Sequence, residues 1–428
     1  MRRLETSEPG FAAAFERLVR DRRESGEDIA RDVADIVRDV RIRGDEALEE
    51  YTERFDKHAL GDDWRIAPEV CREAFEAVDP TLRAALELAA ARIRAFHAQQ
   101  RPADRDETDA EGVRLGSRWR AVDAAGLYVP GGRAAYPSSL LMNAIPAKVA
   151  GVERVAVVTP NPNGEANPLV LAAAHLAEVD EVWRVGGAQA IAALAYGTQR
   201  IAPVDVIVGP GNAWVAEAKR QLYGVVGIDM VAGPSEILVI ADAANDPEWI
   251  VADLLSQAEH DPAAQAILIT DDAGFADRIA DLVGVELALL PTAKVAKASW
   301  EAHGTIIVVG DLAEAPALAN RLAAEHVELA VAEPEALFAQ IRHAGSVFLG
   351  RNCPEAIGDY LAGPNHVLPT GRRARFSSAL SVLDFMKRTS FIELGEGALE
   401  AIGPAAIALA EAEGLGAHAR SIEVRLGI

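Results

Sequence analysis

The chain has 428 residues, half of them hydrophobic and a quarter charged, which is the composition of a globular protein with two or three domains. Its net charge of −23 argues against non-specific binding to nucleic acid and against binding to anionic membrane surfaces. Only two cysteines occur, Cys71 and Cys353, which excludes a disulfide framework and a zinc ribbon and predicts a reducing, cytoplasmic location. The first residues lack the apolar core of a signal peptide, and no stretch is long enough to span a bilayer.

The N-terminal part of the chain favours helices. Helical periodicity with charged opposite faces runs through residues 11–19, 29–40, 45–55 and 80–96. Residues 101–111 are polar and include a proline, which indicates a linker or an exposed loop.

A strand–turn–helix pattern begins near residue 125. An apolar strand end breaks into glycines in Gly126-Leu127-Tyr128-Val129-Pro130-Gly131-Gly132, and a helix is expected at 137–150. Further strands are expected at 155–158, 182–185 and 204–208, alternating with helices at 168–177, 188–196 and 213–222. This alternation is typical of a parallel sheet with crossover helices.

The same alternation returns later in the chain. Apolar segments predict strands at 266–270, 305–309, 329–331 and 346–349, with amphipathic helices such as 272–283 and 334–344 between them. The predicted fold class is therefore α/β, with two doubly wound, Rossmann-like parallel-sheet units at 125–236 and 237–380. We expect the N-terminal helices of residues 1–124 to pack on the second unit, and residues 381–428 to form a helical C-terminal tail.

Gln257 and His260 lie three residues apart near the end of a predicted helix. Asp246 and Pro247 suit its N-cap and first turn, and Pro262 ends it. The spacing places an amide oxygen and an imidazole on one face of the last turn. Such a pair can supply half of a metal site, although ordinary hydrogen bonds at a helix end are the commoner explanation.

Glu325 and His326 lie where a predicted helix meets a strand, a common position for reactive groups in open α/β sheets. Adjacent side chains point in divergent directions, so the pair would suit proton transfers to two different atoms. The alternative interpretation is a solvated turn.

Two later segments combine carboxylates, imidazoles and glycines. One contains Asp359 and His366, and the other, in the C-terminal tail, contains Glu413 and His418. Glycines let the backbone approach a ligand closely, but an ordinary tight turn and a solvated charged segment explain the two patterns as well.

Gly209-Pro210-Gly211-Asn212 follows a predicted strand and opens a helix. Backbone N–H groups at such a position can hold a phosphate, although a plain turn fits as well, and the sequence lacks a Gly-x-Gly-x-x-Gly motif. Cys353 has no evident base beside it and is interpreted as a packing residue.

Several stretches, taken together and in order, resemble histidinol dehydrogenase. The resemblance runs from about residue 121 to the end and is less clear through the N-terminal helices. It is carried by residues 126–132, 142–151, 209–212 and 232–238, by Ser256-Gln257-Ala258-Glu259-His260-Asp261, by Glu325-His326, and by residues 358–370.

The resemblance implies a role for each matching residue. The implied zinc ligands are Gln257, His260, Asp359 and His418, and the implied acid–base pair is Glu325 and His326. Implied substrate contacts are Ser235, His366 and Glu413, together with the zinc ligands and His326. Implied contacts to NAD are Tyr128, Gln189 and Asn212.

The sequence departs from the family's pattern at three positions. Trp214 stands where a tyrosine is expected, Ala324 where a proline is expected, and Ala412 where a charged or polar residue is more usual. None of them is an implied ligand, so the departures concern the fine geometry of the site and not the reaction.

The resemblance further implies the reaction: NAD-dependent oxidation of L-histidinol through L-histidinal to L-histidine, the last steps of histidine biosynthesis. His326 would take the hydroxyl proton as general base, and Glu325 would activate the water that hydrates the aldehyde. One zinc ion per subunit would hold the substrate. The four protein ligands offer oxygen and nitrogen atoms, and the substrate would add to them, so the zinc would have more than the four ligands of a closed structural site.

The resemblance also implies a homodimer with shared active sites, so Glu413 and His418 are expected to complete the site of a partner chain. Two rival interpretations remain. A zinc hydrolase would use metal-activated water with Glu325 as base and would need no NAD. A non-enzymatic α/β protein would bind a small molecule and tolerate loss of both Glu325 and His326.

Overall fold

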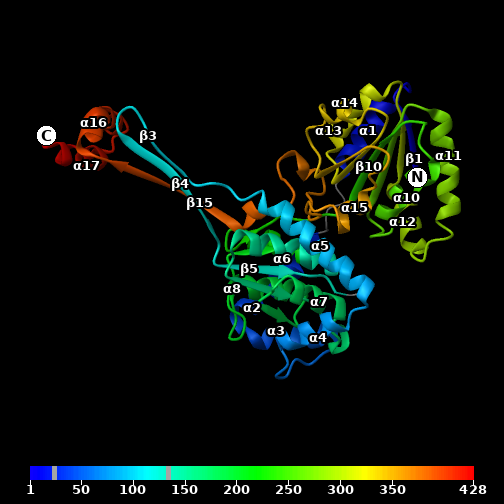
Figure 1. The fold of residues 1–428 in the computed structure, drawn as a ribbon, viewed down its shortest axis with the longest axis horizontal. Coiled ribbons are helices and arrows are strands. Elements are labelled where there is room, and N and C mark those ends of the chain that lie inside the picture. The colour runs from blue at the N-terminus through cyan, green and yellow to red at the C-terminus, as the bar shows by residue number, and fades with distance from the viewer. Residues whose placement is uncertain (22–26, 132–135) are drawn as a thin grey trace.

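The structure is a computed structural model that describes residues 1–21, 27–131 and 136–428. It has two α/β lobes and an arm that extends away from them (Figure 1). Gly132, the last glycine of the predicted strand end, lies outside the described residues. Across the described ranges, no helix combines the length and the apolar character that crossing a membrane requires.

The first lobe is built on a sheet with the strand order β2-β7-β6-β5-β8-β9. The pairs from β7 to β9 are parallel, and β2 joins β7 in antiparallel orientation at one edge. The strands are β2 (Arg65–Ile66), β5 (Ala124–Tyr128), β6 (Arg154–Val158), β7 (Glu181–Trp183), β8 (Val206–Val208) and β9 (Gly227–Ile228). Alternate residues of β6 enter different cores, so both faces of this sheet are covered, as is usual for a parallel sheet.

Helices cover both faces of the first sheet. One face carries α2 (Glu27–Arg43), α3 (Asp45–Asp56), α8 (Gly187–Tyr196) and α9 (Ala213–Leu222). The other face carries α4 (Pro68–Ala77), α5 (Pro80–Ala98), α6 (Pro137–Ala150) and α7 (Pro168–Leu176).

The second lobe is built on a sheet of parallel pairs in the order β1-β12-β11-β10-β13-β14. Its strands are β1 (Arg2–Glu5), β10 (Glu236–Ala241), β11 (Gln265–Thr270), β12 (Thr305–Val308), β13 (His326–Ala330) and β14 (Ser346–Leu349). One face packs on α10 (Pro247–Ala258), α11 (Ala273–Glu286) and α12 (Ala293–His303). The other packs on α1 (Phe11–Arg20), α13 (Ala315–Leu322) and α14 (Pro334–Phe338), and α15 (Glu355–Tyr360) follows β14. The predicted α/β class with parallel sheets is confirmed.

The N-terminal helices divide between the two lobes, contrary to the expectation that they pack on the second unit. β1 pairs with β12, and α1 packs on the second sheet through Phe15 and Leu18. Helices α2 to α5 pack on the first sheet instead; Val33 of α2, for example, shares a core with Ala156 of β6. Helical periodicity defines an apolar face but does not identify the sheet that covers it, which explains the error.

The arm is an antiparallel sheet of β3 (Arg105–Thr108), β4 (Val113–Ala121) and β15 (Met386–Leu394). The linker or loop predicted at 101–111 is therefore partly a strand, which its exposed and charged residues conceal. At the far end of the arm, α16 (Glu396–Ala412) and α17 (Gly416–Leu426) pack on each other (Figure 1). The helical C-terminal tail is confirmed.

Candidate active site

A single residue, Glu236, fixes the side chains of Glu325 and His326 through its main chain. Glu236 opens β10 and His326 opens the neighbouring strand β13. The Glu236 N–H donates to Glu325 Oε2 over 2.9 Å, and the Glu236 carbonyl accepts from His326 Nδ1 over 3.0 Å. Because a carbonyl only accepts, His326 carries its proton on Nδ1 and keeps the Nε2 lone pair available.

The two side chains lie closer together than the sequence prediction implied. We expected them to diverge, but Glu325 Oε2 lies 3.7 Å from His326 Nδ1. The shared anchor at Glu236 overrides the tendency of neighbouring residues to point apart, because both side chains bond the main chain of the same residue.

Burial disfavours charge on both groups. Glu325 is 6% exposed and His326 is 5% exposed. Burial raises the pKa of Glu325 well above its ordinary value, and the nearby carboxylates of Glu236 and Asp359 add to the effect. Burial lowers the pKa of His326 to about 4, against the opposing attraction of Asp359. A neutral imidazole with a free Nε2 is the form that a general base requires.

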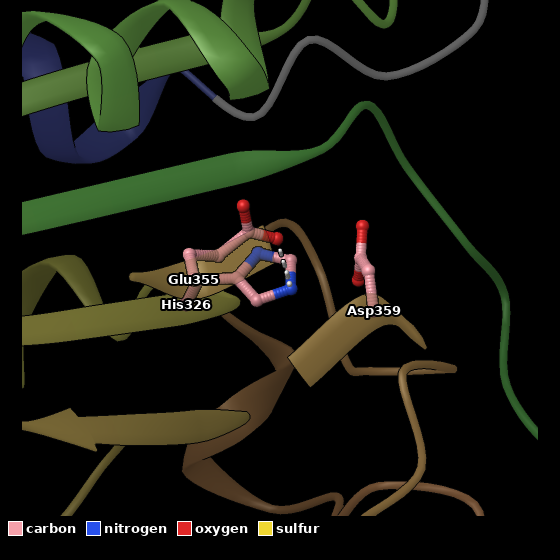
Figure 2. Close-up of side chains that lie close together, drawn as sticks. All are labelled: His326, Glu355 and Asp359. Carbon is pink, nitrogen blue, oxygen red and sulfur yellow. Dashed lines mark ion pairs between the residues drawn. The ribbon is translucent and has the colours of Figure 1, made fainter. Parts of the chain in front are cut away.

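Glu355 is a member of this site that the sequence analysis missed. Its Oε1 lies 3.4 Å from His326 Nε2, and Asp359 follows one turn later on α15. Ligand atoms of His326, Glu355 and Asp359 lie within 4.8 Å of one another (Figure 2). The spacing of four residues between the two carboxylates, on a short helix after Pro354, was the signal that could have revealed it.

The loop after α15 brings the two lobes together. His366 Nδ1 lies 3.0 Å from the Asp359 carbonyl, and its Nε2 lies 3.3 Å from the hydroxyl of Ser139 on α6. The neighbouring Asn365 donates to the carbonyl of Met142, also on α6, over 2.5 Å. Burial lowers the pKa of His366, so its neutral form is favoured here too.

Three of the four implied zinc ligands come from segments that meet at this site. Helix α10, which carries Gln257 and is followed by His260, packs against α15, which carries Asp359. His260 and Asp359 both interact electrostatically with the imidazoles of His326 and His366. Gln257 is 1% exposed, and its Oε1 has no hydrogen-bond partner among the described residues. A buried carbonyl oxygen left unpaired fits a metal ligand, because a bound cation would satisfy it.

The fourth implied ligand is placed elsewhere. His418 lies on α17 and Glu413 just after α16, both exposed, at the far end of the arm from the two lobes (Figure 1). Within this chain they are not brought to the other candidate ligands. Ser235, in contrast, immediately precedes Glu236 and lies at the same edge of the second sheet.

The implied NAD contacts gather at the carboxyl edge of the first sheet. Tyr128 ends β5, Gln189 lies in the first turn of α8 after β7, and Asn212 is the N-cap of α9 after β8. The strand order reverses between β5 and β8, and nucleotides bind at such switch points in doubly wound sheets. The Tyr128 hydroxyl accepts from the N–H of Gly187 over 3.3 Å, and burial raises its pKa to about 12.

A close approach of main chains shapes this edge. Gly209, just after β8, has φ +111°, and a Cβ at this position would lie 2.2 Å from the carbonyl oxygen of Tyr128. Only glycine fits here without displacing the end of β5. The start of α9 is capped within the chain, because Asn212 Oδ1 accepts from the N–H groups of Trp214 and Val215.

A buried ion pair that the sequence analysis missed holds this turn. Lys219 Nζ donates to the Gly209 carbonyl over 3.0 Å and pairs with Asp229, whose Oδ2 accepts from the Gly209 N–H over 2.8 Å. Both side chains are almost fully buried. A lysine among the apolar positions Val215, Ala218 and Leu222 of one helix was the available signal.

Comparisons with known proteins agree with this arrangement. The sequence profile of histidinol dehydrogenase matches residues 19–426. The chain is 61% identical to histidinol dehydrogenase of Zymomonas mobilis, with 99% of each protein covered, and 62% identical to that of Rhodospirillum rubrum, with 99% of this chain and 98% of the relative covered. The crystal structure of histidinol dehydrogenase from Elizabethkingia anophelis matches with a TM-score of 0.94 at 36% identity, covering 100% of this chain and 98% of that one. The resemblance found in the sequence is confirmed, and the chain belongs to the histidinol dehydrogenase family.

Proposed function

We propose that this protein carries out the zinc- and NAD-dependent oxidation of L-histidinol through L-histidinal to L-histidine, the last steps of histidine biosynthesis in the cytoplasm. The observation that carries the proposal is the state of His326. It is a buried, neutral imidazole with Nδ1 held by the Glu236 carbonyl and Nε2 available as a base.

The two candidate acid–base residues have different tasks in this proposal. In the first oxidation, His326 Nε2 takes the hydroxyl proton while the carbinol carbon gives up a hydride. In the second, Glu325 takes a proton from the water that adds to the aldehyde, and the hydrate then gives up the second hydride together with one hydroxyl proton, which passes to solvent and leaves the carboxylic acid. Glu325 needs its carboxylate form for this task. The positive charge of a bound zinc ion would favour that form and oppose the effect of burial on the Glu325 pKa.

Zinc and NAD would supply the remaining chemistry: the metal a fixed positive charge that positions substrate, and the nucleotide a hydride acceptor used twice. One zinc ion per subunit would be held by Gln257, His260 and Asp359, with His418 as the fourth ligand. Substrate would contact these ligands together with His326, Ser235, His366 and Glu413. NAD would lie at the switch point near Tyr128, Gln189 and Asn212.

The position of the C-terminal tail supports a homodimer with shared sites. A site that includes Glu413 and His418 cannot close within the chain as it is folded, because the arm holds both residues away from the lobes. In a two-fold dimer each arm would reach the partner's site, and whatever one chain lends, it also receives. Most strands of the two sheets lie within the expected units 125–236 and 237–380. Val382 and Phe385 pack in the core of the first lobe, so the lent part of residues 381–428 begins beyond them.

One assay tests the proposed function directly. Purified protein is mixed with L-histidinol and excess NAD⁺, and the NADH absorbance and the histidine formed are measured together. We expect two NADH for each histidine. Product formation without NADH would favour the hydrolase interpretation, and binding without turnover would favour a non-enzymatic protein.

A further inference from the structure

A cavity that the proposed reaction does not use lies in the second lobe. Its volume is about 590 Å³, and its wall is formed by the segments that follow β10, β13 and β14. Ligand cavities in proteins usually have volumes of about 300–1,000 Å³. The cavity therefore has room for a small molecule together with some of its water.

The cavity and the candidate active site lie at opposite edges of the second sheet. Glu236 and His326 open β10 and β13, whereas Asn245 and Val331, in the cavity wall, follow the ends of these strands. The five residues of β13 separate the two edges by about 16 Å. The strand order reverses between β10 and β13, and open α/β sheets bind ligands outside the carboxyl ends of their strands at such a switch point. The cavity is thus a second site, distinct from that of His326.

The cavity wall contains two polar atoms without hydrogen-bond partners. Arg351 pairs with Asp242 through one terminal nitrogen over 2.6 Å, but its Nε is buried and has no partner among the described residues. Asn245 is 6% exposed, and its Oδ1 likewise has no partner in the part of the chain that the structure describes. The wall therefore lacks one acceptor beside Arg351 and one donor beside Asn245.

Two exposed side chains complete the wall. Asp246, the N-cap of α10, has an exposed carboxylate next to Asn245. Trp249, in the first turn of the same helix, is 50% exposed and presents an aromatic ring. The cavity thus combines a guanidinium group, a carboxylate, an amide oxygen and a ring.

We propose that this cavity binds a free α-amino acid with a flat side chain. The ligand carboxylate would accept from the guanidinium of Arg351, its ammonium group would donate to Asn245 and Asp246, and its side chain would lie against Trp249. A nucleotide fits less well, because its phosphate would bring further negative charge beside Asp242 and Asp246 in a chain of net charge −23. L-histidine is chosen as the first probe because the proposed function forms it, whereas the site itself stands independently of that function.

Calorimetric titration tests the site in the full-length protein with its metal. The protein is first saturated with L-histidinol in the absence of NAD⁺, so that the candidate active site is occupied. We expect one L-histidine to bind per chain, and L-phenylalanine to bind as well, since its side chain is flat. Histamine lacks the carboxylate and imidazolepropionate lacks the ammonium group. Each should bind at least about tenfold more weakly, because one charge-assisted contact is lost.

Substitutions in the wall locate the binding. Arg351→Met removes the guanidinium, and we expect it to weaken L-histidine binding about 10–100-fold. Trp249→Ala should weaken binding about 2–10-fold through loss of the ring contact. Arg342→Met and Phe338→Ala, at exposed positions elsewhere in the same lobe, are the matched controls and should bind like the wild type. Should Arg351→Met fail to fold without its contact to Asp242, Trp249→Ala still tests the site, because that side chain is half exposed.

The outcomes separate this proposal from the proposed function. Absence of both L-histidine and L-phenylalanine binding in the histidinol-saturated protein would overturn the site. Wild-type affinity in Arg351→Met and Trp249→Ala would also overturn it, because binding would then occur elsewhere. Tighter binding of AMP in excess NAD⁺, lost in Arg351→Met, would replace the amino acid by a nucleotide. A protein that forms no NADH defeats the proposed function, while L-phenylalanine binding still tests the cavity.

Discussion

Removing the ammonium group of Lys219 should destabilise the first lobe strongly. Lys219→Met keeps the buried stem but leaves Asp229 as an unpaired charge that is 1% exposed. Breaking a buried ion pair typically costs about 3–5 kcal/mol. We expect about 3 kcal/mol, the lower end, because Asp229 keeps the N–H donors of Gly209 and Met230 at 2.8 and 2.6 Å.

The second substitution Asp229→Asn then shows whether charge is the cause. In Lys219→Met/Asp229→Asn the amide oxygen can still accept from the Gly209 N–H, and no buried charge is left unpaired. We expect the double variant to recover at least about 1 kcal/mol relative to Lys219→Met. Urea unfolding, compared at an unchanged m value, measures the free energy of unfolding, and Lys297→Met at an exposed position is the control. A Lys219→Met protein as stable as this control would refute the reasoning.

Four further predictions concern the site. Exhaustive chelation should abolish turnover and zinc should restore it, with manganese or cobalt as substitutes, because an oxygen and nitrogen ligand set discriminates weakly among divalent metals; full activity in protein shown to be metal-free by elemental analysis would contradict this. Glu325→Gln should impair oxidation of histidinal more than that of histidinol, and His326→Asn should impair the first oxidation, each by about 10²–10⁴-fold; equal losses at both steps would contradict the division. Subunit exchange between inactive Glu325→Ala and His418→Ala proteins should restore roughly a quarter of the sites, since half the dimers are mixed and half their sites intact; verified mixed dimers without activity would show that the trans arrangement is wrong. In metal-free protein, the His326 pKa of about 4 means that the unfolded chain binds a proton that the folded chain does not, so the contribution of His326 to stability should fall by about 3 kcal/mol as the pH is lowered from 6.5 to 4; an unchanged pH slope in His326→Asn would contradict this.

The sequence predicted best those elements whose apolar pattern is sufficient by itself. The strand expected at 155–158 is β6 (Arg154–Val158), and the one expected at 266–270 is β11 (Gln265–Thr270). The central strand β10 was not assigned, although its run is as apolar as those of β6 and β11, because the expected boundary between the two units at residues 236 and 237 falls within it. The arm was missed for the opposite reason, since the exposed residues of β3 carry no hydrophobic alternation.

The candidate site was predictable only as far as the family resemblance reached. The sequence blocks pointed to Glu325 and His326, but not to the Glu236 peptide that holds them, because a main-chain contact leaves no mark on residue type. Glu355 and Lys219 were missed because their partners, His326 and Asp229, lie on other segments, and residue type alone does not show which segments meet. The roles of the implied zinc, substrate and NAD contacts stay predictions.

The pairing of β1 with β12 has a consequence for the order in which the protein is made. Arg2 is synthesised well before Ala302, which follows 300 residues later in the chain, yet its side chain donates to the Ala302 carbonyl. The strands and covering helices of the first lobe, from α2 to β9, are synthesised within this interval, whereas Val382 and Phe385 join its core later. Until β12 emerges, β1 is an unpaired strand, and such a strand is prone to pair with the wrong chain. The second lobe therefore closes only after β12 is synthesised, and truncated chains that end before β12 should aggregate through the unpaired β1.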